Sequence, residues 1–380
     1  MIYEMKKLLH RKEVWLVLGL SLIAIFLLNC RDQWVSPRRM QITQQKMSAY
    51  SDMPLADVQP LIEREWKQLG GYSSPALGSA KYDDWKVLDD LRDCVIAYLK
   101  HEENMQMLVA KMYNDLTHSA TDFERRDITQ AIRLYNRKTQ YQVCPYNELL
   151  FTMQSVEHDD PIHDLYLLIL CTLLSPLFAV ESETGMYQVL FASKKGKTGL
   201  YRKKIAGGML CAALFALLYT AVTFAILWLK HGLSIRLLLA PIQCADLYQN
   251  CPYSFSILTF AALTATMRAL VGAFIVALTA LMSCCFRKTL AVFGSTAAFT
   301  AILVFLSYLF KNIPIGQMVM KHIGLMRLPH LGDYLTQYDT VNVFGFPVMQ
   351  FWLSILCTCG VILCILAVAY ALYTKRHSRK

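Results

Sequence analysis

Arg268 is the charged residue whose place in the sequence most strongly suggests a role. It lies near the middle of the apolar stretch Phe255 to Phe286, and an uncompensated cation at the centre of a bilayer costs ~3 kcal/mol or more. We therefore expect its side chain to face protein or water, where it lines a translocation path or pairs with an acid of another helix. The stretch is also long for one upright span, so the alternative is a break that brings Arg268 closer to an interface.

Two acids and a cluster of bases form a second candidate site. Glu181 and Glu183 follow one apolar stretch, and a basic turn leads into the next, with Lys194, Lys195, Lys197, Arg202, Lys203 and Lys204. Between them, Met186, Val189 and Leu190 supply one apolar side of the kind that an interface helix presents to a partner. Segment 181–204 is thus predicted to dock another protein. The alternative is that the two glutamates only end a helix and solvate its end.

Catalytic chemistry is not indicated by the sequence. Gly196-Lys197-Thr198 matches the end of a phosphate-binding loop, but the first glycine of such a loop would fall at Phe191, and no strand is predicted before it. The apolar stretches contain neither a His/Glu metal constellation nor a Ser nucleophile with a base. We therefore expect no catalytic residue, no metal site and no cofactor in this chain.

The twelve cysteines do not form a disulfide scaffold, because most fall in or beside apolar stretches, where Cys behaves as a small hydrophobe. Five are expected elsewhere, on the outer side of the membrane: Cys30, Cys94, Cys144, Cys244 and Cys251. Of these, Cys244 and Cys251 form the candidate pair. They are close enough to close a short disulfide loop if their compartment is oxidising, and remain thiols if it is not.

The composition places these residues in a membrane protein. Hydrophobic residues make up 55% of the chain and charged residues 17%, whereas soluble domains carry about 25% charge. A span needs ~20 apolar residues, and six predominantly apolar stretches occur: Val14 to Leu28, Leu165 to Val180, Ile205 to Leu229, Phe255 to Phe286, Leu290 to Phe310 and Val348 to Tyr373. We predict six transmembrane helices in an all-α integral membrane protein.

The distribution of Lys and Arg predicts the orientation of the spans. Basic residues cluster before the first span, between the second and third, between the fourth and fifth, and after the last, and cytoplasmic flanks accumulate such residues. Both termini are therefore expected in the cytoplasm of a multi-pass plasma-membrane protein. The net charge of +10 is read as this topology signal and not as a nucleic-acid-binding surface.

Three regions follow from this topology. Residues 1–30 hold the first span, with a cleaved leader ending near Cys30 as the alternative to an uncleaved anchor. Residues 31–162 are predicted to form a mostly helical extracytoplasmic domain, because apolar residues from Trp85 to Leu116 recur every three or four positions and Thr121 with Glu124 offers a capping box. Residues 163–380 hold five spans, and the segment before the last span is expected to form short or re-entrant helices.

Segment 181–204 resembles the cytoplasmic coupling loop of permease subunits of bacterial type-2 ABC exporters. The resemblance rests on Glu181, Glu183, Gly185, Leu190, Ser193 and Gly196 and on the basic turn that follows. It implies that Glu181, Glu183, Gly185, Met186, Val189 and Leu190 couple to an ATPase. It also implies that residues 1–12 form an interfacial elbow helix.

The function that this resemblance implies is export by alternating access. The chain would work with a second permease subunit, identical or different, and with separate ABC ATPase subunits that bind ATP and Mg and carry out hydrolysis. The substrate would be a peptide, antimicrobial, lipid or drug-like compound, with an amphipathic compound favoured. The alternative is a membrane-anchored sensor or assembly protein that recognises ligands through its outer domain without moving a solute.

Overall fold

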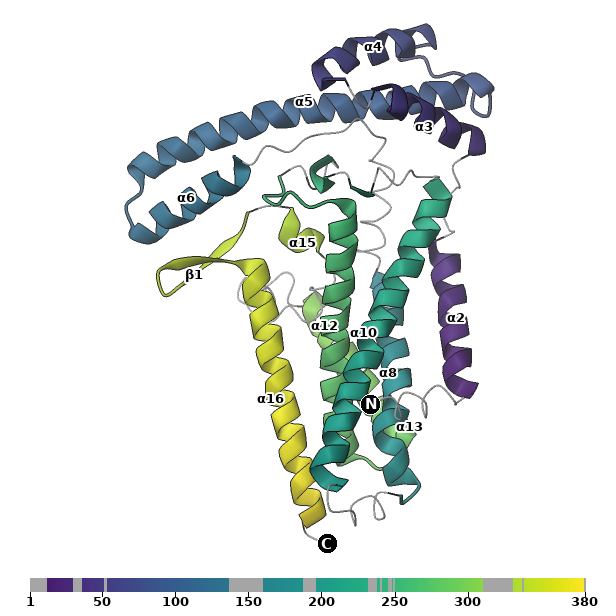
Figure 1. Cartoon of the computed structure of the whole chain (residues 1–380), viewed down its shortest axis with the longest axis vertical. Coiled ribbons are helices and arrows are strands. Elements are labelled where there is room, and N and C mark those ends of the chain that lie inside the picture. Colours follow the sequence, from purple (N-terminus) through teal and green to yellow (C-terminus); the bar gives the residue numbers. More distant parts are fainter. Residues whose placement is uncertain are drawn as a thin grey trace.

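The computed structural model describes residues 12–29, 36–50, 53–136, 160–186, 196–231, 238–239, 241–244, 248, 250–309, 331–336 and 338–378. Long helices form a bundle, and a smaller group of helices lies across one end of it (Figure 1). Residues 183 and 196 lie at the opposite end of the bundle, which we call the loop end.

Five helices of the described chain are long and apolar enough to cross a membrane. They are α8 (Asp160–Glu183), α10 (Gly196–His231), α12 (Ile257–Cys285), α13 (Thr289–Leu309) and α16 (Gln350–Ser378). The chain is therefore a helical, multi-pass membrane protein. The predicted first span corresponds to α2 (Lys12–Asn29), whose described apolar part, Trp15–Ala24, is shorter than a span, so a sixth span stays a prediction.

Helix α12 is the centre of the bundle and packs against α8, α10, α13 and α16. Small residues let α10 approach it closely: a Cβ on Gly272 would lie 2.9 Å from the Cβ of Ala212, and one on Gly208 would lie 3.0 Å from Val276. Contacts between small residues bring membrane helices together in this way, since lipid offers no hydrophobic driving force between them. The pair α10 and α12 is thus the most tightly joined part of the membrane region.

The segment between α2 and α8 is mostly helical, as the sequence predicts. It contains α3 (Pro37–Tyr50), α4 (Leu55–Gln68), α5 (Ala80–His118) and α6 (Asp122–Tyr135). The capping box is confirmed, because the Thr121 side chain accepts from the Glu124 backbone N–H and the Glu124 side chain accepts from the Thr121 backbone N–H. Helices α3 to α5 enclose a separate apolar core around Ile62, Trp66 and Leu91, and we call α3 to α6 the helical domain.

A β-hairpin precedes the last membrane helix, where the sequence predicts short or re-entrant helices. Strand β1 (Thr340–Val343) pairs antiparallel with β2 (Phe346–Met349), so α16 begins at Gln350 and not at Val348. Phe344 and Gly345 both have positive φ, 53° and 86°, as a tight two-residue hairpin turn requires. The Asn342 side chain accepts from the Gly345 N–H at 2.8 Å and thereby stabilises the turn. The short helix α15 (Gly332–Leu335) agrees with the prediction.

Candidate functional site

A buried ion pair joins α8 to α10 near the loop end. The Lys204 Nζ lies 2.7 Å from the Glu181 Oε2, and the two side chains are 8% and 5% exposed. Lys204 also donates to the Phe178 carbonyl at 3.4 Å. Since both charges are buried, removing one of them would leave the other uncompensated. Glu181, which the sequence places on a docking surface, thus faces the neighbouring helix.

Glu183 joins α8 to a third helix. Its carboxylate accepts hydrogen bonds from the backbone N–H of Thr289, at 3.1 Å, and from the Thr289 hydroxyl. Thr289 is the first residue of α13, where free N–H groups and the helix dipole favour a negative charge. The two glutamates therefore fasten the end of α8 to α10 and to α13.

The remaining predicted coupling residues lie in the connection itself. Gly185 has φ +74°, a left-handed conformation that glycine adopts without steric cost, and Met186 is 54% exposed. Val189 and Leu190 lie outside the described residues. Glu183, Gly185 and Met186 are thus the predicted coupling residues that the structure places at the surface.

Arg268 is buried between membrane helices, as the sequence predicts. It is 5% exposed, and its Nη1 donates to the Thr220 hydroxyl of α10 at 3.0 Å. Its guanidinium carbon lies 5.0 Å from the ring centroid of Tyr219. From α8, the Tyr166 hydroxyl donates to the Arg268 backbone carbonyl at 2.8 Å. Because α12 runs from Ile257 to Cys285 as one helix, the alternative of a break near Arg268 is wrong.

Tyr166, Tyr219 and Thr220 surround Arg268 but were not predicted as site residues. The ring centroids of Tyr166 and Tyr219 lie 5.1 Å apart, and both rings are fully buried. The sequence feature that could have identified these three residues is a side-chain hydroxyl group within an otherwise apolar stretch. Polar groups buried in a membrane need partners, so these hydroxyls were candidate partners for the one arginine in the stretch Phe255 to Phe286.

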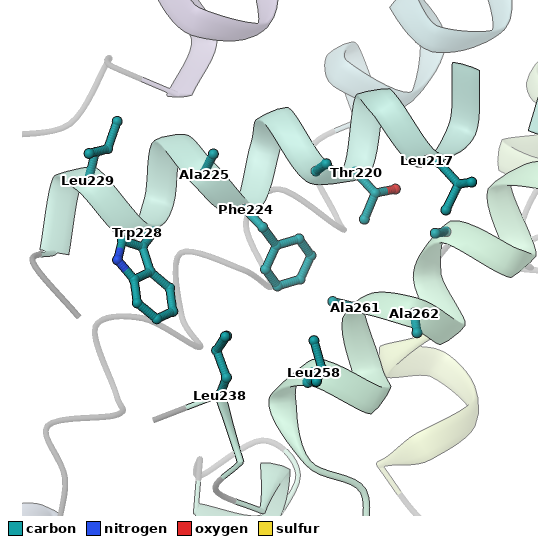
Figure 2. A pocket seen from close by; sticks show the side chains of 12 residues that line it. Leu217, Thr220, Phe224, Ala225, Trp228, Leu229, Leu238, Leu258, Ala261 and Ala262 are labelled. Atoms are coloured by element: carbon teal, nitrogen blue, oxygen red, sulfur yellow. The ribbon is translucent and has the colours of Figure 1, made fainter. Parts of the chain in front are cut away.

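An apolar groove with a volume of about 710 Å³ lies between α10 and α12. Figure 2 shows Phe224 and Trp228 of α10 directed toward Leu238 and toward Leu258 of α12. The groove is also lined by Leu217, Thr220, Ala221, Ala225, Leu229, Ala261, Ala262 and Ala265. Thr220 contributes both to this lining and to the hydrogen bond with Arg268. The lining of the groove thus includes one hydroxyl, that of Thr220, and Arg268 is bonded to this hydroxyl without itself lining the groove.

Aromatic contacts connect α16 to α10 close to the ion pair. The Tyr201 hydroxyl donates to the Leu366 carbonyl at 3.1 Å. The Tyr201 ring lies 5.4 Å from Tyr370 and 5.1 Å from Tyr373, measured between centroids. Helix α10 thus contacts α8 through the Lys204–Glu181 ion pair and α16 through Tyr201. Both contacts lie between the start of α10 and the residues that line the groove.

The predicted disulfide concerns a region outside the spans. Cys251 is a buried thiol whose Sγ lies 3.5 Å from the Tyr253 carbonyl, and burial raises its pKa to about 12, which disfavours the reactive thiolate. The side chain of Cys244 lies outside the described residues, so the pairing stays a prediction. Among the described residues, no group of three or more His, Cys, Asp or Glu side chains is arranged to hold a metal ion.

Comparisons of the chain with models of protein families, with curated proteins and with solved structures found no match.

Proposed function

We propose that the chain is the membrane permease subunit of an ATP-driven ABC exporter of the second structural type. The observation that carries the proposal is the continuity of α10, which forms one helix from Gly196 to His231. Lys204, near its start, pairs with Glu181, and Thr220, farther along, holds Arg268 beside the groove. At ~1.5 Å per residue, these two positions are about 24 Å apart along a single rod.

The mechanism follows from the stiffness of this rod. A partner that moves the 184–195 connection would move the start of α10, and a packed helix transmits a displacement as a shift or rotation of its whole length. The contacts between α10 and α12 at the groove would then change together with those around Arg268. In this proposal, ATP-driven motion at the loop end opens and closes the groove by alternating access.

The groove favours an amphipathic substrate. Its lining is almost entirely apolar, which suits an acyl, peptide or drug-like surface, and the Thr220 hydroxyl in the lining, which is bonded to Arg268, offers a contact to a polar group. Peptides, antimicrobials, lipids and drug-like compounds all have this character. Arg268 is assigned to the translocation path on this basis.

The partners in this proposal are a separate ABC ATPase and a second permease subunit, identical or different. ATP and Mg would bind to the ATPase, which docks on the loop end through Glu183, Gly185 and Met186 and through Val189 and Leu190. The loop end and both termini would then face the cytoplasm, and the helical domain would lie outside the plasma membrane.

Affinity purification from the native membrane tests the proposal. The tagged chain, extracted in mild detergent, is expected to bring a stand-alone ABC ATPase with it, identified by mass spectrometry. Met186→Glu should lower the yield of that ATPase, because it places a charge on an exposed apolar side chain of the docking segment. Leu77→Glu is the matched control, since Leu77 is 84% exposed on the helical domain and should leave the yield unchanged.

The outcomes separate the two classes of function. If the ATPase is recovered equally with Met186→Glu, docking on segment 181–204 is refuted while the exporter assignment stands. If neither form recovers an ATPase, the exporter assignment fails. The sensor or assembly function, which would use the independent core of the helical domain, is then favoured.

A further inference from the structure

The β1–β2 hairpin lies at the boundary between the membrane helices and the helical domain. Strand β2 ends at Met349, and the apolar helix α16 begins at the next residue. Figure 1 shows the hairpin leaving the start of α16 sideways, away from the bundle and close to α6. Because α16 is long enough to span a bilayer, the continuity of the chain places the hairpin at the level where the membrane meets water.

The tip of the hairpin exposes two large aromatic side chains. Phe344 is 99% exposed and Phe346 is 61% exposed, and Trp352, in the first turn of α16, is 53% exposed. Phe344 also has a positive φ of 53°, a conformation in which asparagine or glycine is expected. A phenylalanine here is unfavourable for the turn itself, which indicates that its ring has a role outside the hairpin.

The base of the hairpin is fixed to α6, so the tip is held in one direction. The Tyr338 and Thr340 hydroxyls donate to the Asp127 carboxylate at 2.8 and 2.7 Å. Burial, together with the adjacent Asp127 carboxylate, raises the pKa of Tyr338 above its ordinary value. The phenol therefore stays protonated, and its O–H remains the donor of the hydrogen bond to Asp127. These bonds orient the hairpin without involving the rings at its tip.

A cation accompanies the exposed rings. Arg126 of α6 donates to the Gly345 carbonyl at 3.4 Å, and its guanidinium carbon lies 4.8 Å from the Phe346 centroid. Arg126 thus places one positive charge against an apolar ring, which matches the neighbouring phosphate groups and acyl carbon that a bilayer presents at its surface.

We propose that the hairpin is an interfacial membrane anchor, with Phe344 and Phe346 inserted at the headgroup and acyl boundary and Arg126 among the lipid phosphates. The ligand is the lipid surface of the bilayer in which α16 sits. The anchor ties α6, and with it the helical domain, to the membrane surface beside the bundle. It does not depend on the transport function.

Tryptophan fluorescence in reconstituted protein tests the anchor. Phe344→Trp keeps an aromatic ring at the tip, and its added emission is obtained by subtracting the spectrum of the unsubstituted protein in the same vesicles. Leu77→Trp is the control, because Leu77 is 84% exposed in the connection between α4 and α5, away from the bundle (Figure 1). Vesicles of phosphatidylcholine are compared with vesicles whose acyl chains are brominated near the headgroup, and iodide is the quencher in water.

The anchor predicts that the added emission of Phe344→Trp is blue-shifted, loses most of its intensity in brominated vesicles and resists iodide, while Leu77→Trp shows the reverse. Quenching of Phe344→Trp by iodide alone would overturn the proposal, because the tip then projects into water. Resistance to both quenchers would also overturn it, because the ring is then covered by protein, such as a second copy of the chain. If the Phe344→Trp protein cannot be reconstituted, the same fluorescence measurements are made on Phe346→Trp. The same results then support or overturn the proposal.

Discussion

Replacing Lys204 by methionine should weaken the membrane bundle far more than replacing the adjacent lysine. At an effective dielectric constant of about 20, charges 2.7 Å apart attract by ~6 kcal/mol, and this attraction offsets the desolvation of both groups. Lys204→Met removes the attraction but leaves Glu181 buried and charged, at a cost of ~3–5 kcal/mol. Glu181→Leu combined with Lys204→Met removes both charges and should recover most of that loss.

The assay is thermal unfolding in detergent, followed with a dye that becomes fluorescent on reaction with thiols. The chain suits this method because Cys171 and Cys211 are buried in membrane helices and react only when the bundle opens. The expected cost corresponds to a melting temperature lower by roughly 5–10 °C. Lys203→Met is the matched control, since Lys203 is exposed and its replacement should change the melting temperature little.

Two results would refute this reasoning. Equal melting temperatures for Lys204→Met and Lys203→Met would mean that the ion pair contributes nothing to the packing of α8 on α10. A double variant as unstable as Lys204→Met would mean that the loss comes from side-chain packing and not from an uncompensated charge.

Three further predictions follow from the contacts of α10, α12 and the hairpin. Arg268→Leu should lower export of a fluorescent amphipathic peptide by the reconstituted complex without changing membrane insertion, and unchanged export would place Arg268 outside the path. Gly272→Ala should destabilise the bundle by ~1–3 kcal/mol, because the new methyl would lie 2.9 Å from Ala212. Ala212→Gly in the same chain should restore the melting temperature, and failure to do so would argue against close packing there. Phe344→Asn should stabilise the detergent-solubilised protein by about 1 kcal/mol, because Asn tolerates positive φ; a lower melting temperature would show that the Phe344 ring supports the fold.

Local patterns were sufficient to predict much of the fold. Five of the six apolar stretches correspond to α8, α10, α12, α13 and α16, because length and hydropathy alone decide whether a helix can span a bilayer. The capping box at Thr121 is local, since its two hydrogen bonds join residues three apart. Arg268 was predicted to face protein or water, from the cost of exposing its charge to lipid.

The features of the fold and the site that the sequence did not predict are contacts between residues far apart in the chain and a hairpin with an unusual residue in its turn. Segment 181–204 contains six basic residues after Glu181, and only the packing of α8 on α10 selects Lys204 as its partner. Thr220 and Arg268 are 48 residues apart, so their hydrogen bond cannot be read from spacing. The hairpin was missed because Phe344 occupies a turn position where glycine or asparagine is the usual signal.

The reactivity of a cysteine in the groove tests most directly whether energy at the loop end reaches the groove. Ala262→Cys places a thiol in the lining between α10 and α12, and its rate of modification by a maleimide is followed by mass spectrometry of the peptide that contains it. In the complex purified with its ATPase, trapping with ATP, Mg and vanadate should change this rate several-fold relative to the nucleotide-free complex. Equal rates in the two states of a complex that hydrolyses ATP would contradict the proposed coupling of α10 to the groove.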